Sequence, residues 1–146
     1  MRLKEKISII TGAASGFGKG IAKKFSKEGA KLILVDINKD LLEKVSKDLN
    51  QDFFHTDVSS PSSMKKLSEY VLKKYQTIDI MVNNAGITHL PKPLEDVSEE
   101  EFDKVFSVNS KSVFLCGKFF IPQMKKQKKV QSLIFLRLLA FLQDLI

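Results

Sequence analysis

Three glycines stand at a turn near the start of the chain, in Thr11-Gly12-Ala13-Ala14-Ser15-Gly16-Phe17-Gly18. The turn follows the apolar run Ile7-Ser8-Ile9-Ile10 and leads into a helical pattern with Ile21, Ala22 and Phe25. Glycines let backbone N–H groups approach a pyrophosphate closely, and the N-terminus of a helix adds positive potential. The turn is therefore a candidate phosphate-binding loop. The alternative is that its glycines only permit close packing of a helix on a strand.

A carboxylate follows at a spacing that suits the same chemistry. Asp36 ends the next apolar run, Lys31-Leu32-Ile33-Leu34-Val35. Dinucleotide-binding folds place a carboxylate on the adenine ribose about 20 residues after the glycine turn. Asp36 is accordingly the candidate ribose ligand, and a simple cap at the end of a strand is the alternative.

Strand and helix patterns alternate over most of the chain, and they must position these residues. We expect strands near 5–11, 31–36, 52–56 and 78–83 and helices near 17–28, 39–49, 61–75 and 98–125. Pro61 suits a helix start, Ser98 and Glu101 form a capping-box pattern, and Pro122 should kink or end the last helix. Repeated βα units predict an α/β fold, a Rossmann-type doubly wound parallel sheet with right-handed crossovers.

The bulk composition excludes several classes of protein. A chain of 146 residues with 43% hydrophobic and 28% charged residues is typical of one soluble globular domain. The net charge of +7 comes from scattered lysines, with Arg2 and Arg137 as the arginines, so we expect no nucleic-acid partner. The single cysteine, Cys116, excludes an internal disulfide and fits a reducing cytosol. Without a recognisable signal peptide, the expected location is cytoplasmic.

The composition changes abruptly near Lys125. The basic cluster Lys125-Lys126-Gln127-Lys128-Lys129 precedes an apolar stretch over residues 133–142. This stretch is shorter than the roughly 20 residues that a membrane span needs, and Arg137 interrupts it. We therefore divide the chain into a dinucleotide-binding part, 1–129, and an aberrant apolar tail, 130–146, and we expect no membrane attachment.

Further landmarks occur in a fixed order along the chain. Asp57-Val58 follows the third predicted strand, Asn83-Asn84-Ala85-Gly86 ends the fourth, and Asn109 lies inside the long predicted helix. Together with the glycine turn, these motifs closely resemble the short-chain dehydrogenase/reductase family over about residues 1–129. Three features are most similar to the branch of 3-oxoacyl-thioester reductases and sugar dehydrogenases: Phe17, the segment Gly86-Ile87-Thr88 and the stretch from Phe102 to Phe119.

The resemblance implies a nicotinamide dinucleotide as cofactor and partner. It assigns the pyrophosphate to Gly12, Ser15, Gly16, Phe17 and Gly18. It assigns the adenosine ribose to Asp36 and Ile37 and the adenine to Asp57 and Val58. The nicotinamide side is assigned to Asn84, Ala85 and Gly86. An acidic Asp36 repels a 2′-phosphate, and Ser15 supplies no cation to neutralise one, so NAD is favoured over NADP. Lys39 could soften this preference.

In the family, an asparagine at the position of Asn109 distorts its helix and holds a water in a proton relay, which makes Asn109 the candidate catalytic residue. The alternative is a polar residue that bonds back to its own helix. Asp57 could simply cap the following turn, and Asn83 is expected to tie strands together. His55 and His89 have no partners at metal-ligand or triad spacing, so we predict no metal site.

The family pattern stops after Asn109. Its chemistry needs a serine on the fifth strand and then a tyrosine and a lysine four residues apart on the next helix. Tyr70 and Lys74 have that spacing, but they precede the fourth predicted strand on an outer helix, so we interpret the match as coincidence. We hypothesise a frameshift near Lys129. Residues 133–136 remain apolar enough for a buried strand, and we predict a strand near 132–137 beside the fourth, followed by a short apolar helix or a frayed end.

Three functions follow from these observations. The first is an NAD(P)-dependent oxidoreductase of secondary alcohols and ketones, such as a 3-oxoacyl thioester or a sugar, truncated before its catalytic residues and inactive alone. The second is a residual nucleotide-binding or oligomerisation module that associates through helix 98–125, a homo-oligomer surface that the family often uses. The third is a basic peripheral protein whose tail meets a membrane or other chains.

The frameshift hypothesis makes a direct prediction about the coding DNA. A single-base correction near the codon of Lys129 should restore an open frame that encodes a serine on the fifth strand and then a Tyr-xxx-Lys motif. Sequencing of the gene checks this, and a frame that stays closed after every such correction contradicts the hypothesis.

Overall fold

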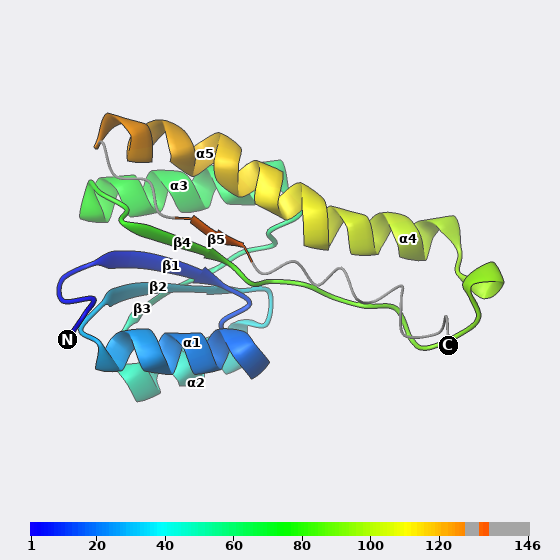
Figure 1. The fold of residues 1–146 in the computed structure, drawn as a ribbon, viewed down its shortest axis with the longest axis horizontal. Coiled ribbons are helices and arrows are strands. Elements are labelled where there is room, and N and C mark those ends of the chain that lie inside the picture. Colours follow the sequence, from blue (N-terminus) through cyan, green and yellow to red (C-terminus); the bar gives the residue numbers. More distant parts are fainter. Residues whose placement is uncertain (128–131, 135–146) are drawn as a thin grey trace.

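A five-stranded parallel sheet forms the centre of the protein, with strand order β3-β2-β1-β4-β5 (Figure 1). The structure, a computed structural model, describes residues 1–127 and 132–134. Its strands are β1 (Ile7–Thr11), β2 (Lys31–Asp36), β3 (Asp52–His55), β4 (Ile80–Asn83) and β5 (Ser132–Ile134). β2 and β3 lie on one side of β1, and β4 and β5 lie on the other side. This strand order is the one expected of a doubly wound sheet.

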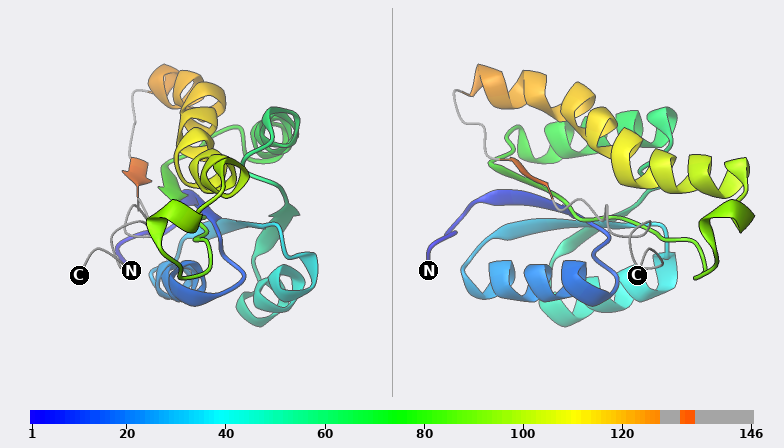
Figure 2. Two further views of the ribbon diagram at one scale, coloured as in Figure 1. Left: turned by 90° about the vertical axis from the view of Figure 1, so that its right-hand side faces the viewer. Right: turned by 45° about the vertical axis from the view of Figure 1, so that its right-hand side comes forward.

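Helices cover both faces of the sheet. Figure 2 shows α1 and α2 on one face and α3 and α5 on the other. The helices are α1 (Gly16–Lys27), α2 (Lys39–Leu49), α3 (Pro61–Tyr75), α4 (Glu99–Phe106) and α5 (Ser112–Lys126), with a 3₁₀ turn at Leu94–Asp96. The predicted α/β, Rossmann-type parallel sheet is therefore confirmed, and each predicted strand and helix of the first 83 residues is present within two residues of its expected bounds.

Alternating side chains of the central strands build two separate cores. Ile9 and Ile33 face α3 and α5 and belong to one cluster with Phe120. Ile10 and Leu34 face the opposite way and pack with α1 and α2. Because both faces are covered, successive residues of one strand are all buried, which explains the continuous apolar runs in the sequence.

The fifth strand lies where the sequence predicts it. β5 pairs in parallel with β4, with Leu133 opposite Val82 and Ile134 opposite Asn83. The strand is confirmed for residues 132–134, and the rest of the predicted strand and tail lies outside the described residues. An apolar fourth strand therefore has a partner on each side.

The long helix predicted over 98–125 is two α-helices joined by a π-helical turn. The expected capping box is present, because Ser98 Oγ accepts from the Glu101 N–H and Glu101 Oε2 accepts from the Ser98 N–H. The π-helical turn spans Ser107–Lys111. Pro122, expected to kink or end the helix, does not end it, since α5 continues to Lys126, and the kink stays a prediction. Burial of Phe120 and Met124 against the sheet holds the last turns in place.

Tyr70 and Lys74 lie far from the chemistry that their spacing suggests. Both side chains donate to Asp52 Oδ2, and Tyr75 is its third donor. Asp52 begins β3, whereas ligands of parallel sheets bind beyond the carboxyl ends of the strands. The cluster therefore ties α3 to the amino end of the sheet, and the interpretation of Tyr70 and Lys74 as a coincidental match agrees with this position.

The three donors act on the ionisation of Asp52. Burial raises the pKa of this carboxyl, but hydrogen bonds from Lys74, Tyr75 and Tyr70 lower it more, so the net pKa lies below its usual value. Burial first, and then the hydrogen bond to Asp52, raises the pKa of Tyr70 and Tyr75. The phenols therefore stay protonated as donors.

In the described part of the chain, no helix is long and apolar enough to cross a membrane.

Replacement of Phe120 by alanine should strongly destabilise the fold. Phe120 is 1% exposed between the sheet and α5, and a buried Phe→Ala change costs about 3–5 kcal/mol of unfolding free energy. The matched control is Phe114→Ala on the same helix, because Phe114 is 64% exposed and its loss should cost about 0.5 kcal/mol or less. Urea denaturation measures both, and equal losses would contradict the packing described above.

Asp52→Asn should make stability less dependent on pH in the acid range. The folded-state pKa of Asp52 is lowered, so its contribution is present above the unfolded value of about 3.9 and is lost as pH falls through the folded value. The variant should therefore be less stable than wild type at pH 7, with the gap closing below about pH 4. Thermal unfolding between pH 7 and pH 3 checks this, with Asp48→Asn on the exposed face of α2 as the control; a gap independent of pH would refute it.

Candidate functional site

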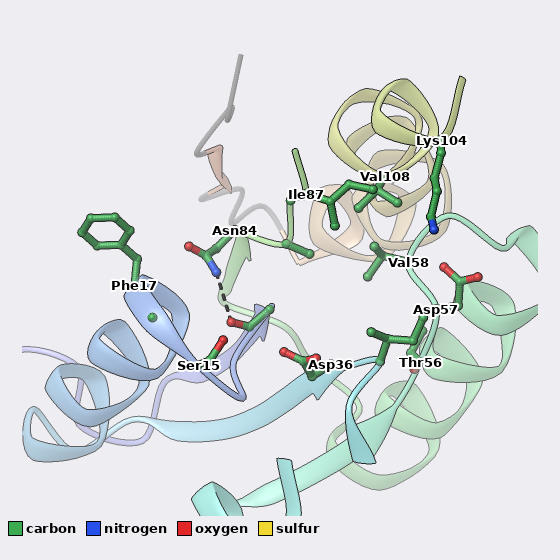
Figure 3. A pocket seen from close by; sticks show the side chains of 15 residues that line it. Ser15, Phe17, Asp36, Thr56, Asp57, Val58, Asn84, Ile87, Lys104 and Val108 are labelled. Atoms are coloured by element: carbon green, nitrogen blue, oxygen red, sulfur yellow. Dashed lines mark hydrogen bonds between the residues drawn. The ribbon is translucent and has the colours of Figure 1, made fainter. Parts of the chain in front are cut away.

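A pocket of about 400 Å³ opens beyond the carboxyl ends of β1, β2, β3 and β4 (Figure 3). Its lining consists of residues from the turns that follow these strands and from α4 and the π-helical turn: Gly12, Ser15, Gly16, Phe17, Asp36, Ile37, Thr56, Asp57, Val58, Asn84, Ala85, Gly86, Ile87, Lys104 and Val108. All the predicted cofactor-binding residues except Gly18 are among them. The fold thus brings together residues that are far apart in the sequence.

The three glycines of the first turn have different roles. Gly12 has φ +66°, and a Cβ there would lie 2.9 Å from the Ala85 Cα. A Cβ on Gly18 would lie 1.9 Å from the Gly12 carbonyl oxygen, so Gly18 permits the start of α1 to pack beneath the turn. Gly16 has φ +51° and no atom within 4 Å of the Cβ position, which leaves open space in the pocket. The packing explanation therefore holds for Gly18, whereas Gly16 borders the candidate site.

The N-terminus of α1 is arranged to receive an anion. Ser15 is the N-cap residue with extended backbone (φ −149°), and its side chain makes no capping hydrogen bond. The first N–H groups of a helix have no intrahelical acceptor, so those of α1 remain available to a ligand in the pocket. With the space at Gly16, these donors fit the pyrophosphate of a dinucleotide. Phe17, at 78% exposure, flanks this turn.

Asp36 stands at the end of β2 as a fixed carboxylate. Its Oδ2 accepts from the Ala14 N–H at 3.0 Å, and its Oδ1 accepts from the Asn38 N–H at 3.0 Å. The residue therefore does cap the end of its strand, and it also lines the pocket. Ile37 follows with 67% of its surface exposed, beside the carboxylate. Each carboxylate oxygen keeps acceptor capacity for a further donor such as a hydroxyl.

The loop after β3 is tied to the end of β2. The Thr56 N–H donates to the Asp36 carbonyl at 3.0 Å. Asp57 Oδ1 accepts from the Ser59 N–H at 2.9 Å and from Ser59 Oγ at 2.7 Å. Asp57 therefore caps the following turn, as the alternative interpretation proposed, while Val58 contributes an apolar wall to the same pocket.

Asn84 joins the ends of β1 and β4. Its backbone N–H and that of Ala85 donate to Thr11 Oγ1, each at 3.0 Å. Its side-chain amide donates to the carbonyls of Thr11 at 2.9 Å and Gly12 at 3.2 Å. The side-chain link between strands thus comes from Asn84, whereas the Oδ1 of the buried Asn83 has no hydrogen-bond partner among the described residues.

Asn109 lies in the π-helical turn and is 6% exposed. Its Oδ1 accepts from the Ile87 N–H at 2.8 Å, and its Nδ2 donates to the Ile87 carbonyl at 2.9 Å. The side chain therefore holds the backbone that follows Gly86, instead of only bonding back to its own helix. The expected distortion of the helix is present, and through Ile87 the asparagine shapes one wall of the pocket.

Four lining residues were missed from the sequence: Thr56, Ile87, Lys104 and Val108. Thr56 and Ile87 directly adjoin predicted site residues, so extension of each motif by one residue would have found them. The sequence signal for Val108 and Lys104 is weaker. It consists only of their spacing, one helical turn apart just before Asn109. Nothing in the sequence says which face of that helix covers the pocket.

The two histidines take no part in the pocket. His55 is exposed, with Nε2 3.0 Å from the Ile37 carbonyl oxygen, and His89 Nδ1 lies 2.7 Å from the Leu90 carbonyl oxygen. The described residues contain no group of three or more His, Cys, Asp or Glu side chains that could hold a metal ion. Burial raises the pKa of the Cys116 thiol to about 12, so this thiol stays protonated in its apolar surroundings.

Comparison with known proteins gives a consistent picture. The model of the short chain dehydrogenase family matches residues 6–135. The chain is 41% identical over 134 residues to zerumbone synthase of Zingiber zerumbet, covering 86% of this chain and 50% of the relative. It is 40% identical over 133 residues to a 3-oxoacyl-acyl-carrier-protein reductase of Thermotoga maritima, covering 88% and 54%.

Solved structures agree with the sequence relatives. A 3-ketoacyl-acyl-carrier-protein reductase from Brucella melitensis, complexed with NADH, superimposes with a TM-score of 0.82 at 40% identity and covers 85% of this chain and 52% of that one. A short chain dehydrogenase/reductase from Burkholderia phymatum, in complex with NAD, gives a TM-score of 0.84 at 29% identity, covering 90% and 48%. The chain thus spans about half the length of the curated relatives and structures that it matches.

The different roles of the glycines predict opposite effects of two alanine substitutions on α1. Gly18→Ala places a methyl group against the Gly12 carbonyl, and such overpacking should cost about 1–3 kcal/mol of unfolding free energy. Gly20→Ala meets no atom within 4 Å and should stabilise the helix by up to about 1 kcal/mol. Urea denaturation measures both, and a neutral Gly18→Ala would contradict the close approach.

Proposed function

This chain belongs to the short chain dehydrogenase family, and on that premise we propose that its pocket binds a nicotinamide dinucleotide. The observation that carries the proposal is the convergence on one pocket of the uncapped start of α1, the open space at Gly16 and the carboxylate of Asp36. The first two suit the negative pyrophosphate, and the carboxylate suits the hydroxyls of a ribose.

The remaining lining residues complete the proposed cofactor site. The N–H groups at the start of α1 hold the pyrophosphate, and Asp36 accepts from the ribose hydroxyls. Ile37 lies with Asp36 at the ribose, Asp57 and Val58 face the adenine, and the segment Asn84–Gly86 faces the nicotinamide. The bound cofactor supplies or accepts a hydride. Asn109 acts on this end of the site by holding Ile87, and in the proposed oxidoreductase it positions the proton relay.

Among the two forms of the cofactor, NAD is proposed over NADP. Hydrogen bonds from the N–H groups of Ala14 and Asn38 hold the carboxylate of Asp36 at the end of β2. A second negative group, such as a 2′-phosphate, would be repelled there. Lys39 gives little relief, because its ammonium lies 3.9 Å from the Glu43 carboxylate on the same helix. Structural neighbours are known with either form, since a short-chain oxidoreductase that resembles this chain is in complex with NADP, whereas those named above hold NADH or NAD.

The proposed reaction class is hydride exchange between this cofactor and a secondary alcohol or ketone. We propose that these 146 residues bind the cofactor without turnover, because both tyrosines, Tyr70 and Tyr75, bond to Asp52 at the opposite end of the sheet. General acid–base groups contribute about 10²–10⁴-fold to a rate. Asn109 by itself supplies no acid for the carbonyl oxygen.

A second candidate function is self-association through the 98–125 segment. Phe102, Phe106 and Phe114 are 49%, 56% and 64% exposed, and the rings of Phe102 and Phe106 stack with centroids 6.1 Å apart. Exposed aromatic clusters favour protein–protein contact. Sedimentation should therefore show a dimer or larger species that Phe106→Glu dissociates, and a monomeric wild type would exclude this function.

Cofactor binding is tested by calorimetric titration of the 146-residue chain with NADH. Wild type should bind, and Gly16→Asp should not, because a carboxylate then occupies the space proposed for the pyrophosphate. Oxidation of trial secondary alcohols with NAD should stay at the level of this variant. Absence of NADH binding by folded wild type would disprove the binding site, and turnover above the variant would disprove the inactivity.

The NAD preference is tested by Asp36→Asn. Loss of a charged acceptor is worth about 1.5–3 kcal/mol, so the affinity for NAD should fall about ten-fold or more while that for NADP changes little or rises. Asp40→Asn, in the first turn of α2 and outside the pocket, is the control and should leave both affinities unchanged. An equal loss for the two cofactors would argue against a role of Asp36 in selecting NAD.

A further inference from the structure

The exposed side chain of His55 holds the segment that follows Asp36. His55 ends β3 and lies opposite Asp36 in the parallel pairing of β2 and β3. Its Nε2 lies 3.0 Å from the Ile37 carbonyl oxygen. Because a carbonyl oxygen only accepts, Nε2 carries the hydrogen and donates it. The neutral Nε2–H tautomer and the imidazolium can both make this bond, so the contact requires no particular charge on the ring.

Two further hydrogen bonds hold the same segment. The Thr56 N–H donates to the Asp36 carbonyl at 3.0 Å, and the Asn38 N–H donates to Asp36 Oδ1 at 3.0 Å. The first of these bonds joins backbone to backbone, and the second lies within the turn itself. The bond from His55 is different, because it reaches the segment from the neighbouring strand through a side chain. A substitution can therefore remove it while the backbone bonds and Asp36 stay unchanged.

The position of Asp36 depends on this segment. Its carboxylate accepts from the N–H groups of Ala14 and Asn38, each at 3.0 Å, and Figure 3 shows it at the end of β2 in the pocket. Rotation of the side chain alone would break both bonds. If the carboxylate instead moves together with its turn, the Ile37 carbonyl moves away from its donor. The bond to His55 therefore opposes a retreat of Asp36 from the pocket.

We propose that His55 is a positioning residue that strengthens the preference for NAD over NADP. A 2′-phosphate must either lie close to the like charge of Asp36 or displace that carboxylate, and the bond from His55 makes displacement more costly. The same bond keeps the carboxylate oriented toward the ribose hydroxyls of NAD. His55 does not itself line the pocket, whereas Asp36 and Ile37 do. This inference rests on the proposed dinucleotide site and on its NAD preference.

Two other roles for His55 predict different results. An imidazolium that attracts the 2′-phosphate by its charge would favour NADP, so removal of the ring would increase the preference for NAD. A histidine that only stabilises the fold would lower the melting temperature and would weaken both cofactors by the same factor. The positioning role instead predicts a smaller preference for NAD in a chain that remains folded.

The experiment measures the ratio of the dissociation constants of NADP and NAD by calorimetric titration. Wild type should prefer NAD, and His55→Ala should reduce the ratio by about three-fold or more, as expected for the loss of one neutral hydrogen bond. His55→Gln should restore the ratio, because its amide Nε2 can donate to the Ile37 carbonyl from a similar position. His89→Ala is the matched control, since His89 follows the proposed nicotinamide segment, which contacts a part that both cofactors share.

A double variant tests whether His55 acts through Asp36. Asp36→Asn removes the charge that repels a 2′-phosphate, so His55→Ala in this background should leave the ratio unchanged. If His55→Ala instead changes the ratio by the same factor in both backgrounds, the two residues act independently and the positioning role is refuted. Thermal unfolding of each variant verifies that it is folded.

Failure of the cofactor site and failure of the positioning role give different results. If folded wild type binds neither dinucleotide, the proposed site is refuted and the role of His55 with it. If wild type binds both equally, the NAD preference and the role of His55 are refuted while the site stands. If wild type prefers NAD but His55→Ala leaves the ratio unchanged or increases it, only the role of His55 is refuted. A ratio that His55→Gln does not restore also overturns the assignment to this hydrogen bond.

Discussion

The hydrogen bonds between the ends of β1 and β4 are the constraint on which the pocket depends. Thr11 Oγ1 receives the N–H groups of Asn84 and Ala85, and the Asn84 amide returns two bonds to the backbone of Thr11 and Gly12. These strands are neighbours in the sheet but lie about 70 residues apart in sequence. Each of these four hydrogen bonds, which together form the seam between β1 and β4, joins a side chain to a backbone group of the other segment. The seam therefore fixes the loop after β1 relative to the loop after β4.

The same seam explains why glycine is needed on both sides of the turn. A side chain at Gly12 would meet Ala85, and one at Gly18 would meet the carbonyl of Gly12. The start of α1 is thereby pressed toward the ends of the strands, with its unpaired N–H groups at the pocket. The candidate phosphate site is thus a consequence of close packing as much as of flexible backbone.

Asn109 stabilises the opposite wall in a comparable way. A π-helical turn loses regular helix geometry, and the two hydrogen bonds between Asn109 and the backbone of Ile87 compensate for it. The turn also directs Val108 into the pocket. The charged side chains at the two ends of the sheet differ in their partners. Asp52 accepts from three donors at the amino end, whereas Lys104 lines the pocket at the carboxyl end.

The local patterns of the sequence determined the elements and most of the site. Apolar runs, the glycine turn, Pro61 and the Ser98–Glu101 box located the strands and helix starts, because these signals act within a few residues of each other. The resemblance to a known family assigned the site residues in the turns after four strands, and all but Gly18 line one pocket.

Only the tertiary structure decided how distant segments meet. The π-helical turn and the continuation of α5 through Pro122 depend on Asn109 bonding to Ile87 and on Phe120 packing against the sheet. The tertiary structure likewise decides that Lys104 of α4 lines the pocket. Such contacts join residues that lie tens of positions apart, and no periodicity within one segment encodes which remote surface it will cover.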